Sequence, residues 1–284
     1  MPADSQDDVA LADWAEAIML AEGIRQLSKS RLRAYIREAF SDDNAEDLME
    51  RVLAEVRRRR FLCSEGYPFE QDFSGMKLLH EPEASAYLFL LCISISESFR
   101  TGSRFKETDE LFDVLVLDAL RLYLGAGCKG ERFGSPASGD RPKNFADSVR
   151  WLCTKMKLAP GPGKARKHAG DGGLDIVVWR DFSDPRSGYL IILAQCTVMD
   201  DWFDKARDLN EDVWRGWIDF GKNPHLTLAI PFVISHPYGK WDELRRNAHT
   251  ILDRLRLCEL LGRTELSLEK RTRQWTSREI TRLK

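Results

Sequence analysis

Two consecutive apolar runs constrain the fold of this chain more than any other feature of its sequence. The first run is LDIVVWRDF at 174–182, and the second is YLIILAQCT at 189–197. Because the turn-forming residues SDPRSG separate them, we expect the runs to form neighbouring antiparallel strands. The second run is continuously apolar rather than alternating, which is typical of a central strand covered on both faces.

The segments around these strands predict a layered α/β core. Periodic apolar residues indicate helices before and after the two strands, and another continuous apolar run indicates one more buried strand. A mixed sheet flanked by helices is the architecture that this order of elements favours. The expected helices cover 110–124, 144–156, 204–221 and 241–262, and the further strand covers 225–235.

Two charged residues interrupt the apolar stripe of the last expected helix. These residues are Asp253 and Arg254. Adjacent residues on a helix do not face each other, so we expect each side chain to bond a different partner. We interpret both as residues of the core rather than as catalytic groups.

The first hundred residues predict a separate, mainly helical module. Helices are expected at 11–24, 28–40 and 44–61, followed by a short strand or hairpin arm at 73–80. Three helices with a small β piece suggest a winged-helix-like module. A polar, glycine-containing stretch at 101–110 indicates a boundary. We therefore expect one domain at 1–104 and a second at 105–284, with an insertion at about 125–165.

The charge of the chain leaves nucleic-acid binding open. The formal net charge of the 284 residues is −2, so binding would depend on local clusters such as Arg57–Arg60 or Lys164–Lys167. Arg57–Arg60 end a helix, where the helix dipole favours positive charge. Two interpretations of these arginines stay open, a solvated helix end and a patch that contacts phosphate.

The cysteines and the apolar segments bear on the compartment. Six cysteines without a Cys-x-x-Cys pair argue against a zinc site, and the acidic N-terminus carries no secretory signal. The most apolar stretch, 86–95, is far shorter than the ~20 residues that span a bilayer. We expect a cytoplasmic protein with reduced cysteines and no membrane contact.

Two polar side chains stand out in the paired strands. Asp175 follows two glycines at the start of the first run, and Gln195 lies near the end of the second. Buried strands rarely carry polar groups without a partner or a function. Together with a carboxylate from the preceding helix, their oxygens could hold a hard divalent cation such as Mg²⁺. A turn aspartate and a hydrogen-bonded core amide are the structural alternatives.

These residues resemble a known family. The stretch GDGGLD at 170–175, the strand that ends near Gln195 and the helical pair Phe112-Asp113 look like the core motifs of the PD-(D/E)XK nuclease superfamily, and within it the Mrr-like restriction endonucleases. The resemblance implies a restriction-endonuclease-like fold over roughly 108–260. It also implies that Mg²⁺ or Mn²⁺ is held by Asp113, Asp175 and Gln195.

One position departs from the pattern of this family. The strand motif of the family carries a lysine two residues after the glutamine, where it activates the attacking water, and this chain has Thr197 there. Threonine carries no charge that could replace the lysine. Lys205, on the helix that follows, is the candidate substitute. A solvated helix lysine is the alternative interpretation of Lys205.

Two functions follow from the resemblance. In the first, the chain is a metal-dependent DNA endonuclease, an effector of a bacterial antiviral defence or restriction system, with catalytic residues Asp113, Asp175, Gln195 and Lys205. In the second, the nuclease fold is catalytically inactive and serves as a binding or scaffolding subunit of a multi-protein defence complex. DNA and other protein subunits are the expected partners.

Overall fold

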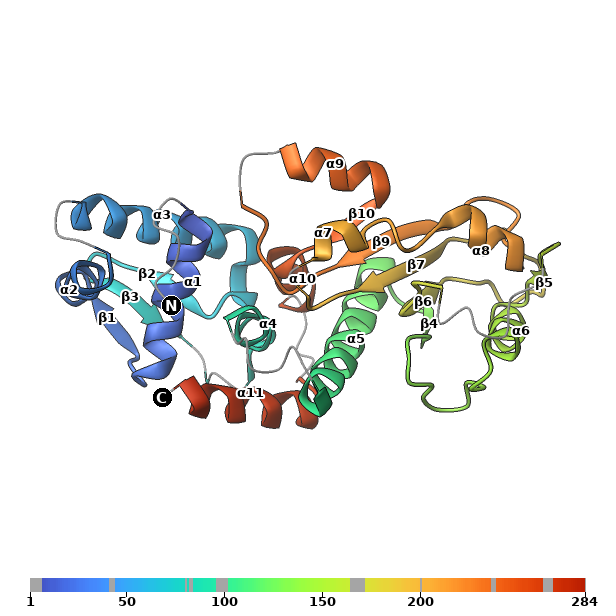
Figure 1. The fold of residues 1–284 in the computed structure, drawn as a ribbon, viewed down its shortest axis with the longest axis horizontal. Coiled ribbons are helices and arrows are strands. Elements are labelled where there is room, and N and C mark those ends of the chain that lie inside the picture. The colour runs from blue at the N-terminus through green and yellow to red at the C-terminus, as the bar shows by residue number, and fades with distance from the viewer. Residues whose placement is uncertain are drawn as a thin grey trace. The chain divides into compact units, whose positions relative to one another are not determined.

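The computed structural model divides the chain into two compact units (Figure 1). The first unit is made of Met1–Thr101, Pro231–Tyr238 and Asp253–Lys284, and the second of Gly102–Ile230 and Gly239–Leu252. The observed boundary after Thr101 is close to the expected one after residue 104. The C-terminal segment corrects the prediction, because Asp253–Lys284 belongs to the first unit and not to the second. The residues that the structure describes are 7–40, 44–79, 81, 84–95, 102–163, 172–199, 201–235, 239–262 and 268–283.

A five-stranded mixed sheet forms the centre of the second unit. Its strands are β4 (Lys129–Arg132), β6 (Ile176–Trp179), β7 (Ile191–Cys196), β9 (His225–Ala229) and β10 (Thr250–Leu252). They lie in the order β10, β9, β7, β6, β4. β6 is antiparallel to β4 and β7, whereas β9 is parallel to β7 and β10. β7 is therefore the central strand, as its continuous apolar run predicts.

Helices pack on this sheet, so the second unit is an α/β fold. α5 (Gly102–Leu124) packs against β4, β6 and β7. α6 (Phe145–Met156) and α8 (Glu211–Trp217) share an apolar cluster with β6 and β7. The same unit contains α7 (Trp202–Lys205), α9 (Gly239–Asn247) and the strand pair β5 (Ala159–Pro160) and β8 (Ile218–Asp219). The predicted α/β class with a mixed sheet is confirmed.

The first unit combines helices with a small antiparallel sheet. Its strands are β1 (Gln26–Ser28), β2 (Phe69–Gln71) and β3 (Gly75–Leu78), paired in the order β1, β3, β2. Its helices are α1 (Asp8–Ala21), α2 (Lys29–Ala39), α3 (Ala45–Cys63), α4 (Ala86–Ile95), α10 (Arg254–Leu261) and α11 (Lys270–Leu283). The three helices expected in this module are confirmed, and β3 lies in the segment expected to be a strand, whose last residue is outside the described ones. β1 and β2 were not predicted.

The apolar stretch at 86–95 forms α4, a ten-residue helix of the first unit. Seven of its residues are buried. Within the described part of the chain, no helix combines the length and the apolar character needed to cross a membrane.

The prediction of a single helix at 241–262 is wrong, because the chain there forms α9, β10 and α10. Thr250–Leu252 pairs in parallel with β9 and so extends the sheet. Asp253 then starts the next helix, since its carboxylate accepts a hydrogen bond from Arg256 N at 3.0 Å. The apolar residues of a short strand fit the face of an amphipathic helix equally well, so their spacing does not reveal the break.

The helix expected at 204–221 is also interrupted. α7 ends at Lys205, and α8 begins after Asn210, whose side chain accepts from Val213 N at 3.1 Å. An asparagine at this position satisfies a backbone donor that the first helical turn leaves open. The residues after α8 form β8, which pairs with β5.

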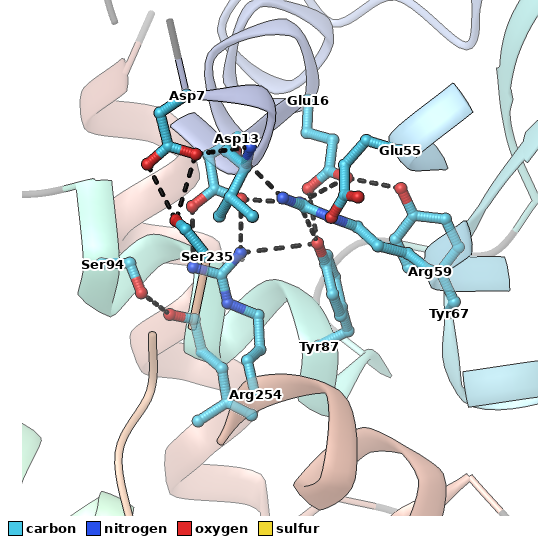
Figure 2. A network of polar contacts seen from close by, with 12 residues as sticks. Asp7, Asp13, Glu16, Glu55, Arg59, Tyr67, Tyr87, Ser94, Ser235 and Arg254 are labelled. Carbon is cyan, nitrogen blue, oxygen red and sulfur yellow. Dashed lines mark hydrogen bonds and ion pairs between the residues drawn. The ribbon is translucent and has the colours of Figure 1, made fainter. Parts of the chain in front are cut away.

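Two buried arginines link the helices of the first unit (Figure 2). Arg59 on α3 is fully buried and donates to Asp13 Oδ1 at 2.6 Å and to Glu16 Oε1 at 3.0 Å. It also donates to Glu55 Oε1 at 2.9 Å. Arg254, fully buried at the start of α10, donates two hydrogen bonds to the carboxylate of Asp13, at 2.7 and 2.9 Å. Asp13 on α1 therefore joins three helices that are distant in sequence.

Two tyrosines extend this network around Glu16. Tyr87 Oη accepts from Arg59 Nη1 at 2.7 Å and donates to Glu16 Oε2 at 2.8 Å. Tyr67 Oη donates to Glu16 Oε1. Burial raises the pKa of both tyrosines well above the ordinary value, so both hydroxyls stay protonated and serve as donors. Both oxygens of this buried carboxylate are therefore hydrogen-bonded (Figure 2).

The contacts of this network test two predictions from the sequence, one for Arg57–Arg60 and one for Asp253 and Arg254. Because Arg59 is buried among carboxylates, neither a solvated helix end nor a phosphate-contacting patch describes all of Arg57–Arg60. The expectation for Asp253 and Arg254 is confirmed, since Asp253 caps α10 and Arg254 bonds Asp13.

We expect Arg254→Met to lower the free energy of unfolding by about 3 kcal/mol, because removing one partner of a buried ion pair leaves the other charge poorly compensated. Urea denaturation of the full chain at pH 7 measures this change. Arg256→Met is the matched control, since it removes an exposed arginine of the same helix. The control should shift the free energy of unfolding by less than about 0.5 kcal/mol. Equal losses in the two variants would contradict the role given to Arg254.

Candidate functional site

The pairing of β6 with β7 brings Asp175 next to Gln195. Asp175 lies one residue before β6, and Gln195 is the fifth residue of β7. The backbone N of Asp175 donates to Ala194 O at 3.0 Å, and Asp175 Oδ2 accepts from Cys196 N at 2.8 Å. These two bonds bracket Gln195 and fix the carboxylate of Asp175 beside it.

A close approach of the backbone at Gly134 brings a second carboxylate to Asp175. Phe133 N and Gly134 N both donate to the carbonyl oxygen of Asp175, at 2.6 and 2.9 Å. A Cβ atom at position 134 would lie 2.9 Å from Asp175 Oδ1 and 3.2 Å from Asp113 Oδ2. Both carboxylates therefore lie against one point of the backbone, and a glycine is needed there.

A cavity of about 510 Å³ opens beside Asp175 in the second unit. Its volume is within the ~300–1,000 Å³ that is usual for ligand sites. Three of the predicted catalytic residues line it, namely Asp175, Gln195 and Lys205. The other lining residues are Asp109, Gly172, Gly173, Cys196, Thr197, Val198, Met199 and Asp208.

Two buried oxygen atoms at this site have no hydrogen-bond partner among the described residues. They are Gln195 Oε1 and Asp113 Oδ1. Buried polar atoms are bonded in the great majority of cases, so an unpartnered oxygen indicates an unobserved water, ion or ligand. Gln195 lines the cavity, and its amide oxygen has no donor among the described residues, which argues against the interpretation of Gln195 as a hydrogen-bonded core amide.

Asp113 lies beside Asp175 but does not line the cavity. Its Oδ2 accepts from Arg132 Nε at 2.7 Å, in an ion pair of two nearly buried side chains. Burial and the negative charge of Asp109 raise the pKa of Asp113 to about 7, although Arg132 acts in the opposite direction.

The acidic residue of α5 that lines the cavity is Asp109, which was not among the site residues predicted from the sequence. It lies four residues before Asp113, and residues four apart share one face of a helix. That spacing was the available signal, but the family motif selects only the later aspartate. Asp109 therefore joins the candidate site residues.

Lys205 reaches the cavity from the last residue of α7. Its Nζ lies 3.1 Å from Asp208 Oδ2, and its side chain is 40% exposed. Thr197, at the position of the family lysine, also lines the cavity, and its hydroxyl accepts from Met199 N at 3.2 Å. Among the described lining residues, Lys205 is thus the one cation.

The glycine before the Leu174-Asp175 pair is required by the packing around the cavity. Gly173 has a φ of +74°, and a Cβ atom there would lie 2.9 Å from Asp208 O. Most side chains are strained at such a φ, so this part of the motif has a structural reason. Outside the described residues lie Gly170, Asp171 and the basic cluster Lys164–Lys167.

Cys196 lines the cavity but is unsuited to act as a nucleophile. Burial, followed by the charges of Asp113 and Asp175, raises the pKa of its thiol well above the ordinary value. The reactive form of cysteine is the thiolate, which such surroundings disfavour. The chemistry available in the cavity therefore depends on its carboxylate, amide and ammonium groups.

The described part of the chain contains no group of three or more histidine, cysteine, aspartate or glutamate side chains arranged to hold a metal ion. A cation in this cavity would therefore need the amide oxygen of Gln195 beside its carboxylate ligands. Oxygens of water or substrate would complete the coordination, as is usual for Mg²⁺.

Comparison with known proteins yields no matching family model, no matching curated protein and no matching solved structure. The resemblance to PD-(D/E)XK nucleases therefore rests on the motif residues alone.

The raised pKa of Asp113 predicts a pH-dependent contribution to stability. The pKa of its carboxyl is ordinarily 3.8 and is about 7 in the fold. The contribution is therefore fully present below about pH 4 and is lost as the pH rises through 7. Asp113→Asn removes this titration, so wild type should lose about 2–3 kcal/mol of stability relative to the variant between pH 5 and pH 8. Urea denaturation at both pH values measures the difference, and an unchanged difference would contradict the raised pKa.

Proposed function

We propose that the cavity of the second unit is the active site of a Mg²⁺- or Mn²⁺-dependent endonuclease that hydrolyses DNA phosphodiesters. The observation that carries this proposal is the buried oxygen of Gln195, which lacks a donor among the described residues and lies beside a fixed carboxylate, that of Asp175. Hard divalent cations bind amide and carboxylate oxygens. Lys205 adds a positive charge to the same cavity, which suits an anionic substrate such as a phosphodiester.

The residues suited to hold the cation are Asp175, Gln195 and Asp109. Gln195 Oε1 fits this assignment, because a cation would supply the interaction that the described residues do not. Asp113 fits less well than Asp109, since Arg132 already engages one of its oxygens and Asp109 lines the cavity. When bound, such a cation polarises a phosphate and lowers the pKa of a water molecule.

The residues of the chain itself would orient the substrate and stabilise charge. The hydrogen bond from Cys196 N sets the direction of the Asp175 carboxylate before any ligand binds. The ammonium of Lys205 would stabilise the negative charge that develops on the phosphate during hydrolysis. Asp208 positions this ammonium, because the two groups form an ion pair at 3.1 Å.

The order of elements in the first unit supports a winged-helix-like module for the recognition of DNA or a partner. Helices and strands follow one another as α1, β1, α2, α3, β2, β3, and the strands form an antiparallel sheet. The buried Arg59 is unavailable to phosphate in this module. Recognition would therefore depend on other basic residues.

A second candidate function is a catalytically inactive nuclease-fold subunit that binds or scaffolds other proteins. Thr197 favours this function, because a neutral hydroxyl stands where the related nucleases carry their lysine. That hydroxyl is also engaged by Met199 N. The two functions differ in whether the cavity supports any metal-dependent cleavage.

Replacing two cavity residues tests the first function. Asp175→Ala should abolish metal-dependent cleavage, because it removes the fixed carboxylate beside Gln195. Lys205→Ala should lower the cleavage rate by about 10²–10³, the scale expected for the loss of one preorganised electrostatic group. The measurement is nicking of supercoiled plasmid by the full chain in Mg²⁺ and in Mn²⁺, with EDTA as the blank.

Lys222→Ala is the matched control for the lysine variant, since Lys222 is exposed in the second unit and does not line the cavity. Its cleavage rate should equal that of wild type, and far-UV circular dichroism checks that all variants are folded. Cleavage that survives Asp175→Ala would locate the active site elsewhere. A wild type that cleaves with neither metal would favour the scaffolding function.

A further inference from the structure

The exposed face of α11 carries charge of one sign. All fourteen residues of this helix are described, and every charged residue that it exposes is basic. Its one acid, Glu279, is 3% exposed and forms an ion pair with Arg282. The exposed basic residues are Lys270, Arg271, Arg273, Arg278 and Arg282.

α2 is another basic helix of the same unit. Three of its cations form ion pairs with glutamates, namely Lys29 with Glu50, Arg31 with Glu22 and Arg33 with Glu46. On α11 the exposed face itself offers no such acid within the helix. Even with Glu269, which is exposed just before α11, exposed bases outnumber exposed acids five to one. The exposed face of α11 therefore carries a net positive charge.

The opposite face of α11 is already covered. Trp275 is 2% exposed and packs against Phe89 of α4, with ring centroids 5.1 Å apart. Thr272 and Thr276 on the same side are buried as well. A basic helix that binds a membrane surface inserts an apolar face among the lipids, and α11 has none to offer. Its partner must instead be recognised by charge.

We propose that the exposed face of α11 binds the phosphate backbone of nucleic acid. Fourteen residues of helix extend over about 21 Å, which corresponds to about six phosphates of one strand at their ~3.4 Å axial spacing. The basic residues run from the first turn to the last, so an extended row of cations meets an extended row of anions. This inference builds on the proposed nuclease function by naming a surface that holds the substrate, but its test requires no cleavage.

The test compares two double variants that remove the same number of charges. Lys270→Gln with Arg273→Gln reduces the basic face of α11, and Arg31→Gln with Arg33→Gln is the control on α2. Fluorescence anisotropy with a labelled DNA duplex, in EDTA and from 50 to 300 mM salt, gives the affinity and its salt dependence for the full chain. The α11 variant should lose about 2 from the slope of log K against log salt, since each released counterion contributes about 0.9. Its affinity at 100 mM salt should fall about 10–100-fold, and the control should retain the wild-type slope.

Several results would overturn the inference. One is an unchanged slope in the α11 variant, and another is an equal loss in the α2 control, which would indicate a general effect of net charge. A wild type that binds no duplex, or one that binds anionic phosphatidylserine vesicles in preference to duplex, would also reject it. Because binding is measured in EDTA, such results leave the nuclease function to the plasmid assay, where cleavage would show that the substrate is held by another surface.

Discussion

The antiparallel pairing of β6 with β7 is the constraint on which the candidate site depends. It aligns Ile176 with Ala194 and so brings Asp175 against the end of the central strand. Side chains alternate between the two faces of a strand, so a shift of one residue in this register would turn Gln195 away from its present neighbours. The central position of β7 also keeps the amide oxygen of Gln195 from bulk water. One pairing thus assembles the site and buries an acceptor that has no donor among the described residues.

The two units differ in whether their buried polar groups have hydrogen-bond partners among the described residues. In the first unit, Glu16 has donors on both oxygens, and Asp13 binds two arginines. Every buried side-chain polar atom without a partner, among the described residues, belongs to the second unit. Satisfied groups stabilise a fold, whereas an unsatisfied oxygen at a cavity indicates a place for a ligand. The same physical rule gives the arginine network a structural role and supports the binding role that we propose for the cavity.

Apolar periodicity and turn residues were sufficient to predict β6, β7, α6 and the part of α5 from residue 110 onward, because these elements are specified by local sequence. The first turns of α5, from Gly102, lie in the polar stretch that was expected to be a boundary. β10 was not predictable, since Thr250–Leu252 is a strand only through its pairing with β9. The positions of Asp175 and Gln195 also followed from the sequence. The ion pair of Asp113 with Arg132 did not, because it joins α5 to β4 in three dimensions. The sequence likewise carried no sign that the Gln195 oxygen has no donor in the described part of the chain, which depends on every neighbour in the fold.

We propose that Asp175 and Gln195 together bind a divalent cation in the cavity. X-ray diffraction from crystals of the full chain soaked in Mn²⁺ tests this binding, because anomalous scattering locates the metal. We predict an anomalous peak about 2.0–2.6 Å from Gln195 Oε1 and from one carboxylate oxygen of Asp175, the usual range for hard cations and oxygen ligands. A peak elsewhere in the molecule, or a water molecule at Gln195 Oε1 with no metal in the cavity at saturating Mn²⁺, would contradict the claim.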